Sequence, residues 1–450
     1  MARSRVHPRA PARLAAALPA LLALGSCAWL GDLFTGADEP PLPGARLSVL
    51  TLETKLTPDP ELARMDIRLP APYRNPDWPQ AGGHPTHAMH HLALADQIAT
   101  RWTERIGAGA NRDRKITSAA VVGNGLVFAM DATGSVSAFR ATDGARAWRV
   151  EVVPRGEERG AIGGGVALDS GVLYVATGYG DVMALRADNG ESMWTRRLGS
   201  PLRGAPTVTA GRAFVLTVHN KLHALAVDSG EVVWSHTGIQ EVAGLVNGAS
   251  PAVVSGLVLA PYTSGELFAL RADNGRETWS DTLTRTGRLV ALADISDIAG
   301  LPVADRGRVF AVSHAGTLTA IDIITGDRVW EQDLAGVQTP WVAGEYLYLV
   351  TTSAEVVAVA RDGGGIHWVH ALTRYGDPRR RRDPVHWYGP VLAGDRLILG
   401  SSQGEVVALS PYTGSVLGTF RVSGGVAVPP VVADGTLYIL TDNATLYALR

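Results

Sequence analysis

The sequence predicts an all-β protein, an eight-bladed β-propeller of four-stranded antiparallel blades that is closed by an N-terminal strand. Three observations lead to this prediction: a motif that recurs along the chain, two turn signals in each copy, and an early strand that supplies what the last copy lacks. A strand-like repeat with a period of about 40–50 residues is typical of propellers.

The motif is clearest in residues 180–194, where an apolar strand with a central alanine is followed by a glycine and a tryptophan. Both faces of this strand are apolar, so we expect it to be buried between neighbouring sheets. The alanine recurs at spacings of 38 to 51 residues, as Ala138, Ala184, Ala224, Ala269, Ala320, Ala358, Ala408 and Ala448.

A set of tryptophans accompanies the repeat, and six of them follow their alanine by ten residues. An indole is large enough to fill the space between two sheets, so we expect these side chains to dock one blade on the next. The set comprises Trp102, Trp148, Trp194, Trp234, Trp279, Trp330 and Trp368.

Two glycines divide each complete copy, one shortly after the alanine, as in Asn189-Gly190, and one 13 or 14 residues before it, as in Gly171. Glycine supplies the positive φ that tight hairpin turns need. Two hairpins per copy give four antiparallel strands, which is one propeller blade.

The last copy ends at Arg450 before its second glycine and its tryptophan, whereas residues 99–107 form a strand around Trp102 that no blade precedes. We expect this strand to complete the last blade, because ring closure removes the free sheet edges of an open array. The propeller is therefore predicted to occupy residues 79–450.

Residues 1–26 are predicted to be a signal peptide, with a basic start and an apolar stretch over residues 14–24 that is too short to span a bilayer. The stretch ends in Leu24-Gly-Ser-Cys27, which resembles a bacterial lipobox, and Cys27 is the only cysteine. We expect Cys27 to be acylated and to anchor the protein, since several acyl chains give stable membrane attachment. The alternative is an ordinary signal peptide with an incidental cysteine.

Residues 27–78 are rich in proline and contain only short apolar runs, so we expect a partly extended tether.

Removing residues 1–26 leaves 37 basic and 43 acidic residues, a net charge of −6. A mildly acidic chain argues against nucleic acid as the main partner.

Two patterns suggest chemistry but have structural alternatives. A histidine cluster (His84, His87, His90 and His91) could bind zinc or copper, yet no cysteine or glutamate completes a familiar pattern, so a capping loop is the competing interpretation. Ser402 lies in a Gly-x-Ser-x-Gly sequence, but a nucleophile elbow needs a strand followed by a helix, and the repeat places a strand-to-strand turn here.

Arg379–Arg382 form the strongest run of charge, in an insertion before the seventh blade. A solvated loop is the first interpretation, and a contact with lipid headgroups or an acidic partner is the alternative.

The repeats, signal, lipobox and tether together resemble the BamB family of outer-membrane assembly lipoproteins. The blade motif is also similar to that of the quinoprotein alcohol dehydrogenases, which bind pyrroloquinoline quinone and calcium. Their usual vicinal disulfide cannot form in a chain with a single cysteine.

The BamB resemblance implies a non-catalytic scaffold without a cofactor, anchored at the periplasmic face of the outer membrane of a Gram-negative bacterium. Its expected partners are the POTRA domains of BamA, other subunits of the β-barrel assembly (BAM) complex, and unfolded outer-membrane proteins. A quinone-dependent dehydrogenase-like protein and a ligand-sensing or adhesive propeller remain the alternatives.

The resemblance also implies two partner-binding segments on rim loops. Leu202 and Arg203 match the first segment, between the second and third blades, and Asp294 and Asp297 match the second, between the fourth and fifth. Ala299 replaces an acid that the family pattern places there. The alternative for Arg203 is an ion pair within the ring.

Overall fold

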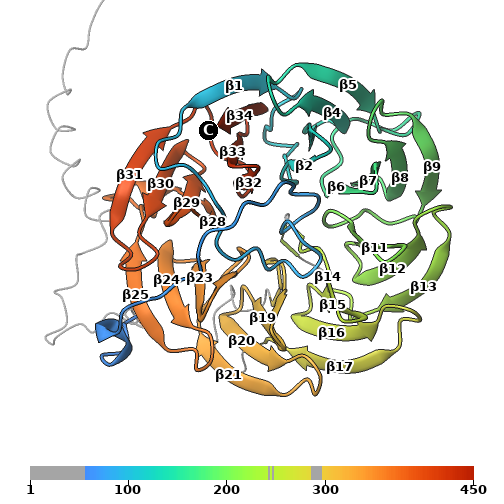
Figure 1. Cartoon of the computed structure of the whole chain (residues 1–450). Helices are drawn as coiled ribbons and strands as arrows, with labels where there is room; N and C mark the ends of the chain where they lie inside the picture. Colours follow the sequence, from blue (N-terminus) through green and yellow to red (C-terminus); the bar gives the residue numbers. More distant parts are fainter. Residues whose placement is uncertain (1–55, 242–243, 246–247, 285–295) are drawn as a thin grey trace, which may run out of the picture. The chain divides into compact units, whose positions relative to one another are not determined.

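The computed structural model describes residues 56–241, 244–245, 248–284 and 296–450, and the structural statements below concern these residues. Leu56–Arg450 form one compact unit. Within it, eight four-stranded antiparallel sheets follow one another around a ring, which confirms the predicted propeller (Figure 1).

In the first seven blades, the strands follow one another outward from the central channel in sequence order. The first three blades are β2 (Val121–Gly123), β3 (Leu126–Met130), β4 (Ser135–Arg140) and β5 (Arg146–Glu151); β6 (Gly164–Asp169), β7 (Val172–Thr177), β8 (Asp181–Arg186) and β9 (Ser192–Arg197); and β10 (Thr207–Thr209), β11 (Arg212–Leu216), β12 (Lys221–Ala226) and β13 (Val232–Thr237).

Blades four to six are β14 (Ala252–Val254), β15 (Leu257–Pro261), β16 (Glu266–Arg271) and β17 (Glu277–Thr282); β18 (Val303–Asp305), β19 (Arg308–Val312), β20 (Thr317–Asp322) and β21 (Arg328–Asp333); and β22 (Trp341–Ala343), β23 (Tyr346–Val350), β24 (Glu355–Ala360) and β25 (Ile366–Ala371). Blade seven is β28 (Trp387–Ala393), β29 (Arg396–Ser401), β30 (Glu405–Leu409) and β31 (Val416–Arg421).

Blade eight joins distant segments of the chain. Its inner strands are β32 (Val431–Ala433), β33 (Thr436–Leu440) and β34 (Thr445–Leu449), and its outer strand is β1 (Thr100–Arg105). Trp102 lies opposite Ala448, the register that Trp148 and Ala138 have within blade one. The predicted closing strand is therefore present and in register.

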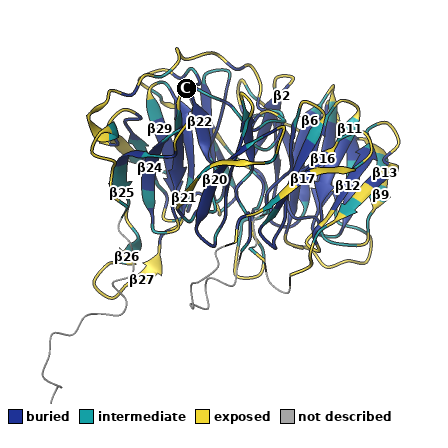
Figure 2. Cartoon of the chain, turned by 90° about the horizontal axis from the view of Figure 1, so that it is seen from below, coloured by how far each residue is buried: buried dark blue, intermediate teal, exposed yellow. Residues whose placement is uncertain are grey.

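The tryptophans join neighbouring blades. In each case the indole Nε1 donates a hydrogen bond to a backbone carbonyl of the next blade, with lengths from 2.7 to 3.1 Å. The ring also covers a turn glycine: a Cβ on Gly230 would lie 2.5 Å from the Trp194 ring. Figure 2 shows the strands buried between blades and the exposed residues confined to outer strands and loops.

Antiparallel order gives the ring two different faces. The turns between second and third strands and the links between blades lie on one face, which we call the link face. The turns between first and second strands and between third and fourth strands lie on the other, the turn face.

Residues Asn75–Leu92 make a circuit inside the ring, visible as the blue segment over the centre of Figure 1. The circuit is hydrogen-bonded to the first strand of every blade in order: through Asn75 to blade eight, Trp78 to blade one, Pro79 to blade two, Gln80 to blade three, Pro85 to blade four, Thr86 to blade five, His90 to blade six and Leu92 to blade seven. A bridge between Tyr73 and Leu92 closes it.

The compact unit thus begins earlier than the predicted boundary at residue 79. A short 3-10 helix, η2 (Leu62–Arg64), contacts β25, and Asp59 N donates to Ile366 O at 2.8 Å. Ile67 is buried. Residues 56–78 therefore belong to the propeller, because they pack on blade six and start the circuit.

A short hairpin, β26 (Tyr375–Asp377) and β27 (Arg382–Pro384), lies in the link between blades six and seven and projects away from the blades in Figure 2. In the described part of the chain, no helix has the length and apolarity needed to cross a membrane.

Candidate partner-binding site

The structure joins two of the predicted partner-binding residues to each other. Arg203 Nη2 donates to Asp297 Oδ1, and Arg203 Nη1 donates to Pro261 O at 3.3 Å. The second carboxylate oxygen, Asp297 Oδ2, accepts from Leu245 N at 2.8 Å. The pair therefore ties together three successive inter-blade links and the second strand of blade four.

These residues are interior rather than exposed. Only 3% of the Arg203 surface is accessible to solvent, and Leu202 and Asp297 are completely buried. This corrects the expectation that they lie accessible on rim loops: the alternative considered for Arg203, a pair within the ring, is what the structure has. Leu202 is held by pairing with Thr217 and cannot offer its side chain to a partner in this conformation.

Close backbone contacts explain why these links stay together. A Cβ on Gly204 would lie 2.7 Å from Gly248 O, and one on Gly248 would lie 2.4 Å from Arg203 Cβ. Ser250 Oγ also donates to Ala205 O at 2.8 Å. The links pack without side chains between them, so the ion pair positions a compact part of the link face.

Val218 and Ile239 are accessible apolar residues on the same link face, and no sequence motif indicates them. They retain 38% and 61% of their exposed surface. Val218 N donates to Pro201 O at 2.9 Å, next to the segment that holds Arg203, and Ile239 follows β13 in the link to blade four. Neither belongs to a repeated motif, so only their position on the folded ring distinguishes them.

The central channel opens on the link face into a cavity of about 940 Å³. Its walls include Leu245, His314 and Asp442, from inter-blade links and from turns between second and third strands, and Tyr388 from β28. A smaller cavity of about 140 Å³ shares Tyr388 and is also lined by Trp78 and His87. The circuit therefore closes the opposite end of the channel.

Two of the four clustered histidines make buried structural contacts. His87 is buried, and its Nδ1 lies 2.7 Å from Pro302 O; burial lowers its pKa to about 4. His91 is also buried, with Nδ1 2.8 Å from Pro70 O and Nε2 accepting from Asp395 N at 3.1 Å. Among the described residues no group of three His, Cys, Asp or Glu side chains could hold a metal ion. The side chains of His87 and His91 fix the circuit to the ring.

Comparison with known proteins identifies the family. The family model for the outer membrane protein assembly factor BamB matches residues 132–370 and 353–450. The chain belongs to the BamB family.

Curated BamB proteins agree over most of their length. The Salmonella typhimurium protein is 31% identical over 360 residues, which are 78% of this chain and 88% of that protein. The Escherichia coli protein is 30% identical over 357 residues, with the same coverage. These relatives are named as assembly factors and not as enzymes, which supports the predicted non-catalytic character.

Solved structures support the fold. BamB from Moraxella catarrhalis aligns with a TM-score of 0.68 at 20% identity, covering 79% of this chain and all of that one. A quinohemoprotein alcohol dehydrogenase from Comamonas testosteroni aligns with a TM-score of 0.63 at 15% identity, covering 86% and 82%. At these identities the likeness concerns architecture, so the BamB assignment rests on the sequence relatives.

The remaining predicted positions have different outcomes. Ser402 lies in the turn between β29 and β30, as expected, so it is not on a nucleophile elbow. Arg379–Arg382 are exposed on the β26–β27 hairpin of this BamB-family ring. Cys27 and Asp294 lie outside the described residues.

Proposed function

We propose that this protein is a non-catalytic scaffold subunit of the BAM complex and aids the folding and insertion of outer-membrane proteins. The observation that carries the proposal is its 31% identity to a protein named outer membrane protein assembly factor, over 88% of that protein. A rigid ring with eight sets of loops suits a scaffold, because binding residues commonly lie on loops that a rigid framework positions.

Acylation of Cys27 would attach the ring to the periplasmic face of the outer membrane. The basic, then apolar, residues 1–26 and the lipobox-like sequence before Cys27 support this step. The exposed Arg379–Arg382 could then face anionic headgroups or an acidic partner surface.

The partner we propose for the link face is BamA, through its POTRA domains. The buried Arg203–Asp297 pair would hold the links of blades two to five in place, and Val218 and Ile239 would make the contacts. Exposed apolar side chains beside a fixed set of loops are a suitable centre for a protein interface, which excludes water from such residues.

The test is co-purification of a tagged, lipidated full chain from its native membrane in mild detergent. Wild-type protein is expected to recover a β-barrel protein with POTRA domains, and Val218→Glu with Ile239→Glu should reduce that recovery at least tenfold. Ile324→Glu is the matched control, since Ile324 is 78% exposed but lies in a turn on the turn face.

Two outcomes would count against the proposal. Failure of the wild-type chain to recover a POTRA-containing protein would reject the scaffold assignment. Equal recovery by the double variant and the wild type would reject the docking surface while leaving membership of the complex intact.

A further inference from the structure

The interface between blades seven and eight differs from the other seven. Elsewhere a cross-strand row runs from the second strand through an alanine on the third to a tryptophan on the fourth, as in Phe128, Ala138 and Trp148. In blade seven the same row is Ile398, Ala408 and Gly418. The side chain that docks every other blade on its neighbour is missing here.

The reason for the difference lies in blade eight. Each indole rests on the turn that joins the third and fourth strands of the next blade, as Trp368 rests on Gly414. In blade eight the third strand is β34 and the fourth is β1, so no such turn joins them. A tryptophan from blade seven would have no turn to cover.

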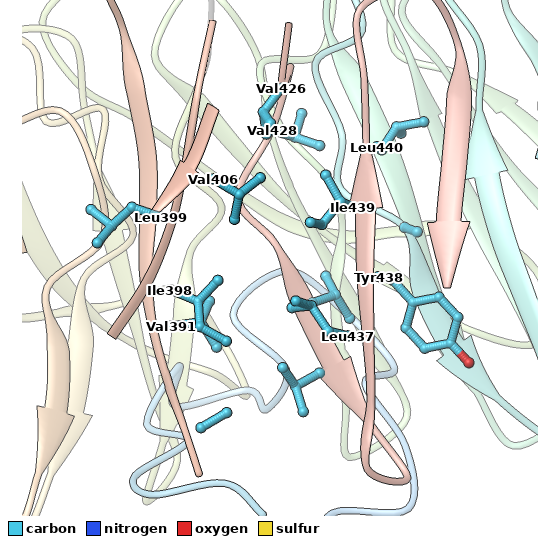
Figure 3. Close-up of a cluster of buried hydrophobic side chains, with 14 of the residues drawn as sticks. Val391, Ile398, Leu399, Val406, Val426, Val428, Leu437, Tyr438, Ile439 and Leu440 are labelled. Atoms are coloured by element: carbon cyan, nitrogen blue, oxygen red, sulfur yellow. The ribbon is translucent and has the colours of Figure 1, made fainter. Parts of the chain in front are cut away.

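An open groove takes the place of the indole. Its volume is about 470 Å³, and its lining includes Ile398, Val406, Ala408 and Gly418 from blade seven and Leu437 from blade eight. Figure 3 shows Ile398, Val406 and Leu437 in the space between the two sheets, while Leu399 and Tyr438 point away from it. A Cβ on Gly418 would meet no atom within 4 Å.

The connecting segment before β1 borders the groove without filling it. Ile98 is half-buried at the groove wall, and Arg396 fixes the segment by donating to Asp96 O at 2.7 Å. The outer strand β31 is exposed along most of its length, and Val416 and Leu417 retain 50% and 54% of their surface. An unpaired strand edge therefore runs beside an apolar slot.

We propose that this groove binds an extended polypeptide segment that carries a tryptophan. The segment would pair with the free edge of β31 and insert its indole between blades seven and eight. An added strand gains backbone hydrogen bonds, and a side-chain pocket supplies selectivity. The slot corresponds to a position that an indole occupies at seven other interfaces of the same ring.

Transmembrane β-strands have this chemistry, because they alternate apolar residues and carry aromatic side chains near the membrane interfaces. Assigning the segment to such a strand rests on the proposed function. The binding of an indole-bearing peptide does not, and it can be measured without any other subunit.

The probe is a fluorescein-labelled nine-residue peptide of alternating threonine and valine with a central tryptophan, titrated with the purified full chain in detergent. The same peptide with alanine at the centre should bind about tenfold more weakly or worse, since one buried aromatic side chain is sufficient for a tenfold change in affinity. Gly418→Trp should fill the slot from within and reduce binding of the tryptophan peptide by a similar factor. Gly418→Ser, which leaves the slot open, should bind like the wild type.

A second variant avoids dependence on the folding of Gly418→Trp. Leu417→Glu changes an exposed side chain of the groove and should also reduce binding about tenfold. No saturable binding by the wild type, equal binding of the two peptides, or unchanged binding by both Gly418→Trp and Leu417→Glu would overturn the proposal. Co-purification of a POTRA-containing protein would be unaffected by these results, so the two failures are distinguishable.

Discussion

Trp102 of β1 lies opposite Ala448 of β34, although one residue begins the ring and the other ends it. The neighbouring residues Thr103 and Tyr447 continue the same register, and the Trp102 indole donates to Ala141 O of blade one at 3.0 Å. This strand therefore completes blade eight and joins it to blade one at once. The ring is therefore closed by the non-covalent pairing of this strand with β34.

The first prediction concerns this closure. Trp102→Ala should lower the free energy of unfolding by about 3–5 kcal/mol, because it removes a buried indole and leaves a cavity. Urea unfolding followed by far-UV circular dichroism measures the effect. Arg101→Ala, on the exposed face of the same strand, is the control and should change stability by less than about 0.5 kcal/mol. Equal stability of the two variants would show that Trp102 does not secure the ring.

The second prediction concerns the Arg203–Asp297 pair. Arg203→Ala or Asp297→Ala should each destabilise the protein by about 3–5 kcal/mol, because each leaves a buried charge without its partner. The double variant Arg203→Met with Asp297→Leu should be much closer to the wild type, since neither charge remains. A double-mutant cycle by urea unfolding checks both statements.

The control for that cycle is an exposed ion pair. Arg271→Ala breaks a contact with Asp273 in which both side chains are more than half exposed. Such pairs contribute little to stability, because solvent and salt screen the two exposed charges. If Arg203→Ala cost no more than Arg271→Ala while abolishing co-purification of the partner, Arg203 would be a contact residue and not a structural one.

The repeat made the blades predictable because each blade solves the same packing problem with the same residue types. Ala184 permits close approach, Trp194 fills the gap to the next blade, and Gly190 forms the turn between their strands, so spacing alone indicates the register. The closing strand was predictable for the same reason, since Trp102 is the one tryptophan of the pattern without a preceding alanine.

The circuit and the ion pair were not predictable in this way. The circuit is held mostly through backbone atoms, such as Pro79 O and Thr86 O, which carry no sequence signature. Arg203 and Asp297 meet only because the ring brings the links of different blades together. Their residue types suggest a charged contact, and sequence cannot say whether that contact is internal or external.

The third prediction concerns the anchor. Cys27→Ser should move the protein from the outer-membrane fraction to the soluble periplasmic fraction, because it removes the thiol that would be acylated. Fractionation with metabolic palmitate labelling measures both location and modification. Ser26→Ala retains the thiol and should remain labelled and membrane-bound. A membrane-bound, unlabelled wild-type chain would refute lipid attachment at Cys27.

The fourth prediction concerns acid sensitivity. Burial lowers the pKa of His87 in the folded protein to about 4, whereas the same side chain in the unfolded chain should have the ordinary histidine pKa of 6.5. Between these values the unfolded state binds more protons, so stability falls as pH is lowered from about 6.5 to 4. The difference between the two pKa values corresponds to a loss of roughly 3 kcal/mol in the free energy of unfolding.

Urea unfolding at pH 7, 5.5 and 4.5 tests this dependence. His87→Gln removes the titrating group and should lose less stability on acidification than the wild type. His386→Gln, at an exposed histidine, is the control for the substitution itself. If stability depended on pH equally in His87→Gln and in the wild type, groups other than His87 would cause the acid sensitivity.

The fifth prediction separates two roles of glycine in the blades. Gly211 and Gly230 have similar backbone conformations, with φ of +74° and +68°. A Cβ on Gly211 would meet no atom within 4 Å, whereas one on Gly230 would lie 2.5 Å from Trp194. Gly211→Ala should therefore lower the free energy of unfolding by about 1–2 kcal/mol, the penalty for placing alanine in the left-handed conformation.

Gly230→Ala should cost that amount and an overpacking penalty of roughly 1–3 kcal/mol, because the indole must move from the neighbouring turn. Its movement would also lengthen the hydrogen bond from Trp194 Nε1 to Val227 O, now 2.9 Å. Urea unfolding measures the difference in stability between the variants, and near-ultraviolet circular dichroism reports the packing of the indole. Equal losses in the two variants would mean that the turn needs glycine for its backbone alone, and that the tryptophan does not depend on close approach to the next blade.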